Sequence, residues 1–233
     1  MPVFRLSTHG SEHRVTARGG FTLIELLVVI GLIVLLVGGL TLALGDTAGN
    51  SLAGAQNTLS SLVSSARAQA AVNQTQARVV IYATRPPGGD VEKYLRLLQV
   101  FVANPEGSKT WAAVGSPVYL PRGVYVVPNS TAGLLAAGVI WPANPQPVSK
   151  TLGTDGAPTT AQGNPFFGAS AVIYVEFQPD GSVKPASSPY TQIALSTATL
   201  SNNTPQFNNP GAIRGVIIRP NGAVSFVNEP AGF

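Results

Sequence analysis

The sequence contains no cysteine, and its two histidines, His9 and His13, both lie within the first twenty residues. Without cysteine there is no disulfide framework, no thiolate nucleophile and no cysteine-ligated zinc site. If the N-terminal stretch is removed, catalysis by Ser-His-Asp or Cys-His groups and the usual transition-metal sites are excluded as well. The composition therefore argues against an enzyme, and no cofactor or metal is expected.

Charge is also scarce, because only 10% of the 233 residues are charged, against about a quarter in an average soluble domain. The formal net charge is +4, of which Arg5, Glu12, Arg14 and Arg18 contribute +2. The remainder is only mildly basic, which is not the electrostatic footprint of a nucleic-acid-binding protein.

Long apolar runs are confined to residues 21–44, where eighteen of twenty-four positions are aliphatic or aromatic. As a helix this segment would be roughly 36 Å long, enough to cross a hydrocarbon core of about 30 Å. Arginines precede it and Asp46 follows it, so the positive-inside rule places residues 1–20 in the cytoplasm. The expected topology is a single pass through the inner (cytoplasmic) membrane with a periplasmic or extracytoplasmic head.

An ordinary secretory signal peptide cut after Gly45 is the alternative, because Ala43 and Gly45 are small residues at suitable positions. Its apolar region would be about twice the usual 7 to 15 residues and would carry a carboxylate, Glu25, near its start.

Residues 45–77 have the pattern of an amphipathic helix that continues into the head. Apolar residues recur at spacings of three and four, at Leu52, Ala55, Leu59, Leu62, Val63, Ala66 and Ala70. No proline lies between Val3 and Arg85, so this segment and the apolar run can form one helix of about 55 residues. Gly45, Gly49 and Gly54 are its weak points, where we expect a bend or local melting.

Residues 78–233 alternate between apolar and polar positions and contain eighteen of the nineteen prolines, which predicts a β-rich head. The expected strands are residues 78–83, 94–103, 124–127, 171–177, 192–200, 213–219 and 223–227. Residues 179–181 and 220–222 are turn signals, and the second is expected to close a hairpin. Residues 141–170 and 201–212 are expected to be loops, with Phe166-Phe167 filling the core. The fold class is α+β, a long N-terminal helix packed on antiparallel sheets.

The segment 18–29, RGGFTLIELLVV, closely resembles the N-terminal signature of type IV prepilins and type II secretion pseudopilins. In that family a prepilin peptidase cuts after a glycine, and the new N-terminal residue is methylated. The resemblance implies cleavage between Gly20 and Phe21, N-methylation of Phe21, and removal of residues 1–20 as a leader. It also makes Glu25 the assembly carboxylate.

A functional role for Glu25 is also expected on physical grounds that do not depend on this resemblance. A carboxylate near a bilayer is expensive and is functional by default. After cleavage, the amine of Phe21 is a cation with which the Glu25 of a neighbouring subunit could pair, setting the register of otherwise featureless helices. The simpler alternative is that Glu25 snorkels from the first helical turn, where a negative charge is favourable.

The rest of the chain looks most like the H-type minor pseudopilins and related minor type IV pilins. The similarity involves the long helix, the β-rich head and residues 117–125 and 176–181. It implies a structural subunit whose partners are other pilin or pseudopilin subunits, the membrane and a secretion or pilus assembly platform. The absence of a C-terminal cysteine pair argues against a major pilin, and the proline that often kinks the family's helix is missing.

Three other functions remain as alternatives. A DNA-binding minor pilin would need a basic C-terminal motif, but Arg214 and Arg219 are five residues apart and face opposite sides of an extended strand. A calcium-stabilised head would use Asp155, Glu176 or Asp180, which do not form a closely spaced ligand run. An enzyme based on carboxylates alone has no support beyond the presence of acidic residues.

Overall fold

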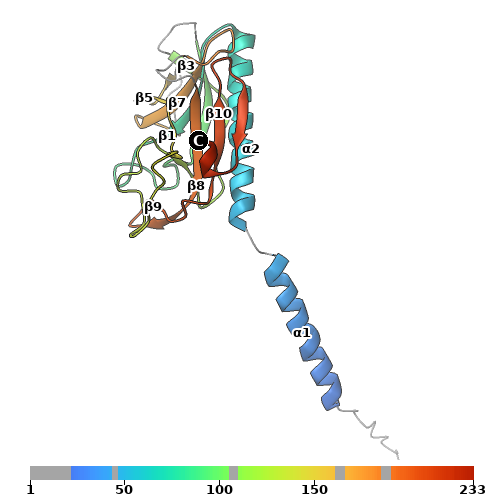
Figure 1. The fold of residues 1–233 in the computed structure, drawn as a ribbon. Coiled ribbons are helices and arrows are strands. Elements are labelled where there is room, and N and C mark those ends of the chain that lie inside the picture. Colours follow the sequence, from blue (N-terminus) through green and yellow to red (C-terminus); the bar gives the residue numbers. More distant parts are fainter. Residues whose placement is uncertain (1–21, 44–46, 105–109, 161–165, 185–189) are drawn as a thin grey trace, which may run out of the picture. The chain divides into compact units, whose positions relative to one another are not determined.

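The computed structural model describes residues 22–43, 47–104, 110–160, 166–184 and 190–233. The chain divides into two compact units, Met1–Gly45 and Asp46–Phe233. Helix α1 (Leu23–Ala43) belongs to the first unit and helix α2 (Thr47–Asn73) to the second. The strands of the second unit (Figure 1) are β1 (Ala77–Tyr82), β2 (Leu97–Ala103), β3 (Thr110–Tyr119), β4 (Val124–Val127), β5 (Gly153–Gly156), β6 (Thr159–Thr160), β7 (Ala171–Phe177), β8 (Thr191–Ser201), β9 (Thr204–Phe207), β10 (Ile213–Ile218) and β11 (Val224–Val227). A short 3-10 helix, η1 (Pro230–Gly232), follows β11.

Helix α1 is apolar and exposed along its described side chains, with Leu23 82% and Leu35 74% accessible. None of the helices in the described part of the chain is long and apolar enough to cross a membrane. Phe21 and Leu44, the ends of the predicted span, lie outside the described residues.

Helix α2 runs without interruption through Gly49 and Gly54. The local melting that we expected at these two glycines is therefore wrong, because the packing of the helix on the head outweighs the low helix propensity of glycine. Gly45, the third expected weak point, lies outside the described residues, as does the rest of the segment 44–46. A single continuous helix is accordingly not confirmed.

The strands form two sheets. The first has the order β5-β7-β1-β2-β3-β6, and the second has the order β11-β10-β8-β4, with β9 paired to β8. All of these pairs are antiparallel except β3–β6, which is parallel. The expected α+β class with antiparallel sheets is confirmed with that one exception. The hairpin predicted at Asn221-Gly222 is also confirmed, since it joins β10 to β11 and Gly222 has a φ of 77°.

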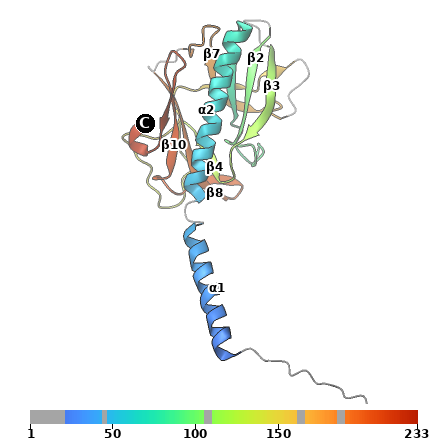
Figure 2. The ribbon, with the colours of Figure 1, turned by 90° about the vertical axis from the view of Figure 1, so that its right-hand side faces the viewer.

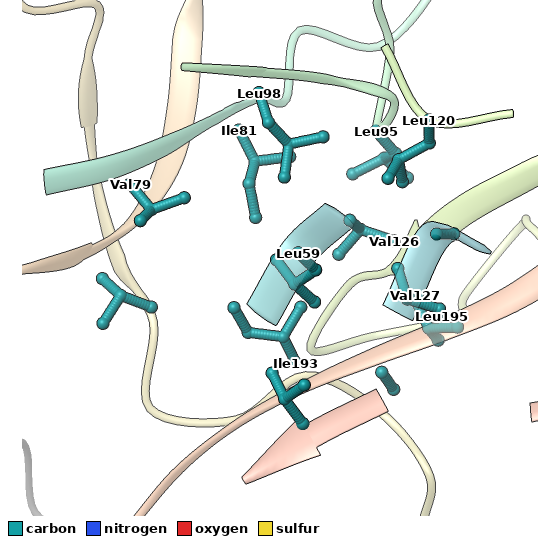
Figure 3. Close-up of a cluster of buried hydrophobic side chains, with 14 of the residues drawn as sticks. Leu59, Val79, Ile81, Leu95, Leu98, Leu120, Val126, Val127, Ile193 and Leu195 are labelled. Atoms are coloured by element: carbon teal, nitrogen blue, oxygen red, sulfur yellow. The ribbon is translucent and has the colours of Figure 1, made fainter. Parts of the chain in front are cut away.

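Helix α2 packs across both sheets of the head, with β10 on one side of it and β2 and β3 on the other (Figure 2). Leu59, Val63 and Ala66 of α2 are fully buried in this core, and Leu62 packs against its edge. Figure 3 shows Leu59 among side chains from both sheets, including Ile81 of β1 and Ile193 of β8. The amphipathic pattern therefore identified the face that docks.

A second apolar cluster covers the opposite face of the six-stranded sheet. On β1, Val79 and Ile81 belong to the main core, whereas Val80 and Tyr82 belong to the second cluster. The same division holds on β7, where Val175 and Phe177 belong to the main core and Val172 belongs to the second cluster, so both faces of this strand are covered. The predicted core-filling role is confirmed for Phe167, which is 1% exposed and contacts the rings of Tyr82 and Phe101. It is wrong for Phe166, which is 40% exposed because the chain turns its side chain away from the cluster that Phe167 enters.

Several strands lie where loops or nothing regular was expected. Strands β5 and β6 fall within residues 141–170, and β9 falls within residues 201–212. Strand β3 was missed as well; Trp111 is the one buried residue among its ten, and the strand contains Pro117. Strand β5 pairs with β7, β6 with β3, β9 with β8, and β3 with β2. These pairings keep the segments extended, although none of them has a clear apolar pattern of its own.

Candidate functional site

Glu25 lies in the first turn of α1 and forms a reciprocal cap with Thr22. The backbone N–H of Thr22 donates to Glu25 Oε2 at 3.1 Å, and the Thr22 hydroxyl donates to the same oxygen at 3.2 Å. In return, the backbone N–H of Glu25 donates to Thr22 Oγ1 at 3.3 Å. This is the capping box that a Ser/Thr-x-x-Glu/Gln sequence forms at a helix N-terminus.

The capping box satisfies two N–H groups that would otherwise lack partners at the start of an apolar helix. It uses only Oε2 of Glu25, and within the described residues Oε1 accepts no hydrogen bond. Among the described residues, Oε1 is therefore available as an acceptor while Oε2 caps the helix. Gly20 and Phe21, the predicted processing residues, lie outside the described residues.

The surface of α1 around this cap is apolar. Eleven large apolar side chains between residues 23 and 35 are more than half exposed: Leu23, Ile24, Leu26, Leu27, Val28, Val29, Ile30, Leu32, Ile33, Val34 and Leu35. A continuous apolar surface of this kind marks a site of association with protein or lipid. Glu25 is the acidic residue in the first turn of this helix.

Gln56 fastens α2 to the second sheet and was not predicted. Its side-chain amide nitrogen donates to the carbonyl oxygens of Gly215, at 2.7 Å, and Val227, at 2.9 Å. Gln56 is 3% exposed, so both bonds are shielded from water. Its position between Leu52 and Leu59 on the apolar stripe was the available signal, because a polar residue there must find a buried partner.

The acidic residues considered as calcium ligands have other partners. Arg78 donates from Nε to Glu176 Oε2 at 2.7 Å, and its NH1 lies 3.6 Å from Asp155. Lys184 Nζ lies 3.0 Å from Glu176 Oε1. The guanidinium of Arg78 also stacks between aromatic rings, 4.3 Å from Trp111 and 4.0 Å from Tyr174. Glu176 is therefore the centre of a charge network that joins β1 to β7.

Asp180 has a turn role. Its Oδ1 accepts from the backbone N–H of Ser182 at 2.8 Å. Hydrogen bonds from Ser182 hold the pKa of the Asp180 carboxyl below its usual range. Among the residues described, no group of three or more potential ligands could hold a metal ion.

The two arginines considered for DNA binding do not form a joint site on β10. Arg214 is the second residue of the strand, whereas Arg219 follows its last residue, Ile218. They are thus separated by the length of the strand.

No family model and no curated protein matches the chain. Among solved structures, the chain is similar to the type IV minor pilin FimU of Pseudomonas aeruginosa PAO1, at 13% sequence identity and a TM-score of 0.38. The similarity covers 79% of this chain and 92% of the other. Similarity at this level does not establish a shared fold, so the function is inferred from this chain's own residues.

Proposed function

We propose that this chain is a minor structural subunit of a type II secretion pseudopilus or a type IV pilus. The observation that carries the proposal is the start of α1: an exposed apolar helix, capped by Thr22 and Glu25, directly follows the Gly20-Phe21 cleavage motif. An enzyme or a soluble binding module has no evident use for this combination. The β-rich head, fastened to α2, would then be the part exported.

The proposed maturation removes residues 1–20 and leaves Phe21 as the methylated N-terminal residue. The segment 21–44 would hold the subunit in the inner membrane, with the head in the periplasm or outside the cell, until the assembly platform adds it to a filament. The exposed apolar side chains of α1 supply the surface for this, since lipid and neighbouring apolar helices can both cover them.

The two carboxylate oxygens of Glu25 would have different roles. Its Oε2 caps its own helix, and Oε1 would accept from the Phe21 amine of a neighbouring subunit in the filament. An ion pair within an apolar bundle is strongly orientation-dependent, and removing one partner typically costs several kcal/mol because the other charge stays buried. The pairing would therefore fix the stagger between subunits.

The capping box provides a test that separates the two roles. Glutamine can replace glutamate in a capping box but carries no charge. Glu25→Gln should therefore preserve the helix start and lose the intersubunit pair, whereas Thr22→Ala should weaken the cap and keep the carboxylate.

The measurement is the amount of each variant in sheared filaments relative to its level in membranes, by quantitative immunoblotting. We expect the filament fractions of Glu25→Gln and Glu25→Ala to fall to a similar extent, while their membrane levels stay normal. The filament fraction of Thr22→Ala should remain near that of the wild type. If Glu25→Gln assembles at the wild-type level, Glu25 is only a helix cap and the register-setting role is wrong.

A further inference from the structure

Two pockets flank the first turns of α2, and each contains an arginine. One, the Arg214 pocket, has a volume of about 310 Å³ and is lined by Leu52, Asn209, Arg214 and Asn228 among others. The other, the Arg122 pocket, has a volume of about 300 Å³ and is lined by residues that include Ser51, Arg122, Thr199 and Asn208. The adjacent residues Asn208 and Asn209 thus contribute to different pockets.

The two pocket arginines stand apart from the ion pairs of the described residues. Within the described part of the chain, Arg122 and Arg214 make no hydrogen bond or ion pair, although Arg214 is half-buried. Four other cations of the head pair with carboxylates: Arg78, Lys93, Arg96 and Lys184. Among the described residues that line the two pockets, none is acidic. Neither guanidinium group thus pairs with an anion of the described part of the chain, and each can take one from outside it.

The remaining polar groups suit an oxyanion. Oδ1 of Asn209 accepts from the backbone N–H groups of Gly211, at 3.0 Å, and Ala212, at 3.2 Å. This fixes the orientation of the carboxamide and leaves its NH2 group as a donor beside Arg214. In the Arg122 pocket, Ser51 and Thr199 supply hydroxyl groups. A phosphate group, with several acceptor oxygens, fits such a set of donors.

The proposed topology places both pockets near a membrane surface. Thr47, where α2 begins, is three residues beyond Leu44, the end of the predicted span, and three residues reach at most about 11 Å. Leu52 is five residues further along a helix that rises about 1.5 Å per residue. The phosphates of the lipid headgroups are the anions concentrated at that depth.

We propose that the Arg122 and Arg214 pockets bind the phosphate headgroups of anionic lipids at the exported surface of the membrane. The two contacts, one on each side of α2, would tether the head to the bilayer before the subunit is assembled. This inference rests on the proposed function, since it requires the predicted span to be inserted.

The test uses the full chain purified in a neutral detergent, with bound lipid counted by native mass spectrometry. The probes are phosphatidylglycerol, phosphatidylcholine and soluble glycerol phosphate. The double variant Arg122→Gln/Arg214→Gln removes both pocket cations. The control Arg67→Gln/Arg219→Gln removes the same charge from exposed arginines that line neither pocket.

We expect phosphatidylglycerol to bind more tightly than phosphatidylcholine, and the pocket variant to lose affinity for it by roughly five-fold for each arginine removed. The control should stay within about two-fold of wild type, and both variants should keep the wild-type melting temperature because none of the four arginines has an ion-pair partner among the described residues.

Equal loss in both double variants, or none in the pocket variant, would overturn the proposal. Binding of glycerol phosphate as tight as that of phosphatidylglycerol would assign the pockets to a soluble anion instead. The titration uses purified chain, so its outcome is separate from processing and filament incorporation, which test the proposed function itself.

Discussion

Gln56 of α2 donates a hydrogen bond of 2.7 Å to the carbonyl oxygen of Gly215 on β10, 159 positions later in the chain. A second bond from the same nitrogen reaches Val227 on β11. Both lie within an otherwise apolar interface, where a polar group is tolerated only with its partner in place. This arrangement fixes where α2 lies along the second sheet, in addition to the apolar contacts that hold it there.

Replacing Gln56 by alanine should lower the free energy of unfolding of the head by about 2 kcal/mol, because two buried carbonyl groups lose a donor. Asn57→Ala is the matched control, since Asn57 is the adjacent, exposed carboxamide on the same helix. Its effect should be within about 0.5 kcal/mol. Urea denaturation of both variants gives the comparison, and equal stabilities would show that Gln56 is not an anchor.

A fragment of residues 47–233 should be soluble, monomeric and cooperatively folded, because α2 and both sheets form one core. A fragment of residues 78–233 should aggregate, because removing α2 exposes the sheet side chains that contact Leu59, Val63 and Ala66. The longer fragment begins at residue 47 and not at residue 55, because Leu52 is also buried in the core. Size-exclusion chromatography and thermal melting are the measurements; similar behaviour of the two fragments would contradict the docking role of α2.

Glu176→Gln should destabilise the head by about 3 kcal/mol, because the charge of Arg78, whose side chain is only 13% exposed, loses its closest partner. Lys184→Gln removes the other cation of the network, whose side chain is 58% exposed, and should change stability by less than about 1 kcal/mol. Chemical denaturation of the two variants measures this difference. If Lys184→Gln is the more damaging change, the network is not centred on the Arg78–Glu176 pair.

The sequence was sufficient to predict those elements whose own residues carry an apolar or turn pattern. Strands β4 and β7 begin and end at the predicted residues, and the turn at Asn221-Gly222 was identified from its backbone requirements. The buried face of α2 follows from apolar residues at helical spacing, because one face of that helix contacts a large core.

The elements that were missed depend on partners far away in the chain. Strand β5 is Gly153–Gly156, without an apolar residue, and is extended because it pairs with β7. Strand β9 similarly pairs with the end of β8. Nothing in the local sequence specifies these pairings, so propensity favours a loop.

The candidate site also has a part that could be predicted from the local sequence and a part that could not. The position of Glu25 in the first turn follows from the sequence, and the Thr22-x-x-Glu25 spacing already contains the capping box. By contrast, the bond from Gln56 to Gly215 and the placement of Arg122 and Arg214 in separate pockets beside α2 depend on the tertiary fold.

Processing after Gly20 has a simple mutational check. Gly20 has no side chain, and the peptidase must accept the backbone next to the bond that it cuts. Replacing Gly20 by leucine should therefore block cleavage and leave a membrane-bound precursor, visible as a larger species on immunoblots. A Gly20→Ala variant, as the smallest change, should be cut at least in part, and normal processing of the leucine variant would contradict cleavage at this position.

Cleavage after Gly20, on which the proposed pilin role depends, is tested most directly by the intact mass of the wild-type chain purified from membranes of cells that contain the peptidase. We expect a chain that begins at Phe21, carries one methyl group on its amine and retains residues 21–233. A chain that begins at Asp46 would contradict it, because the apolar helix that carries Glu25 would then be a discarded signal peptide.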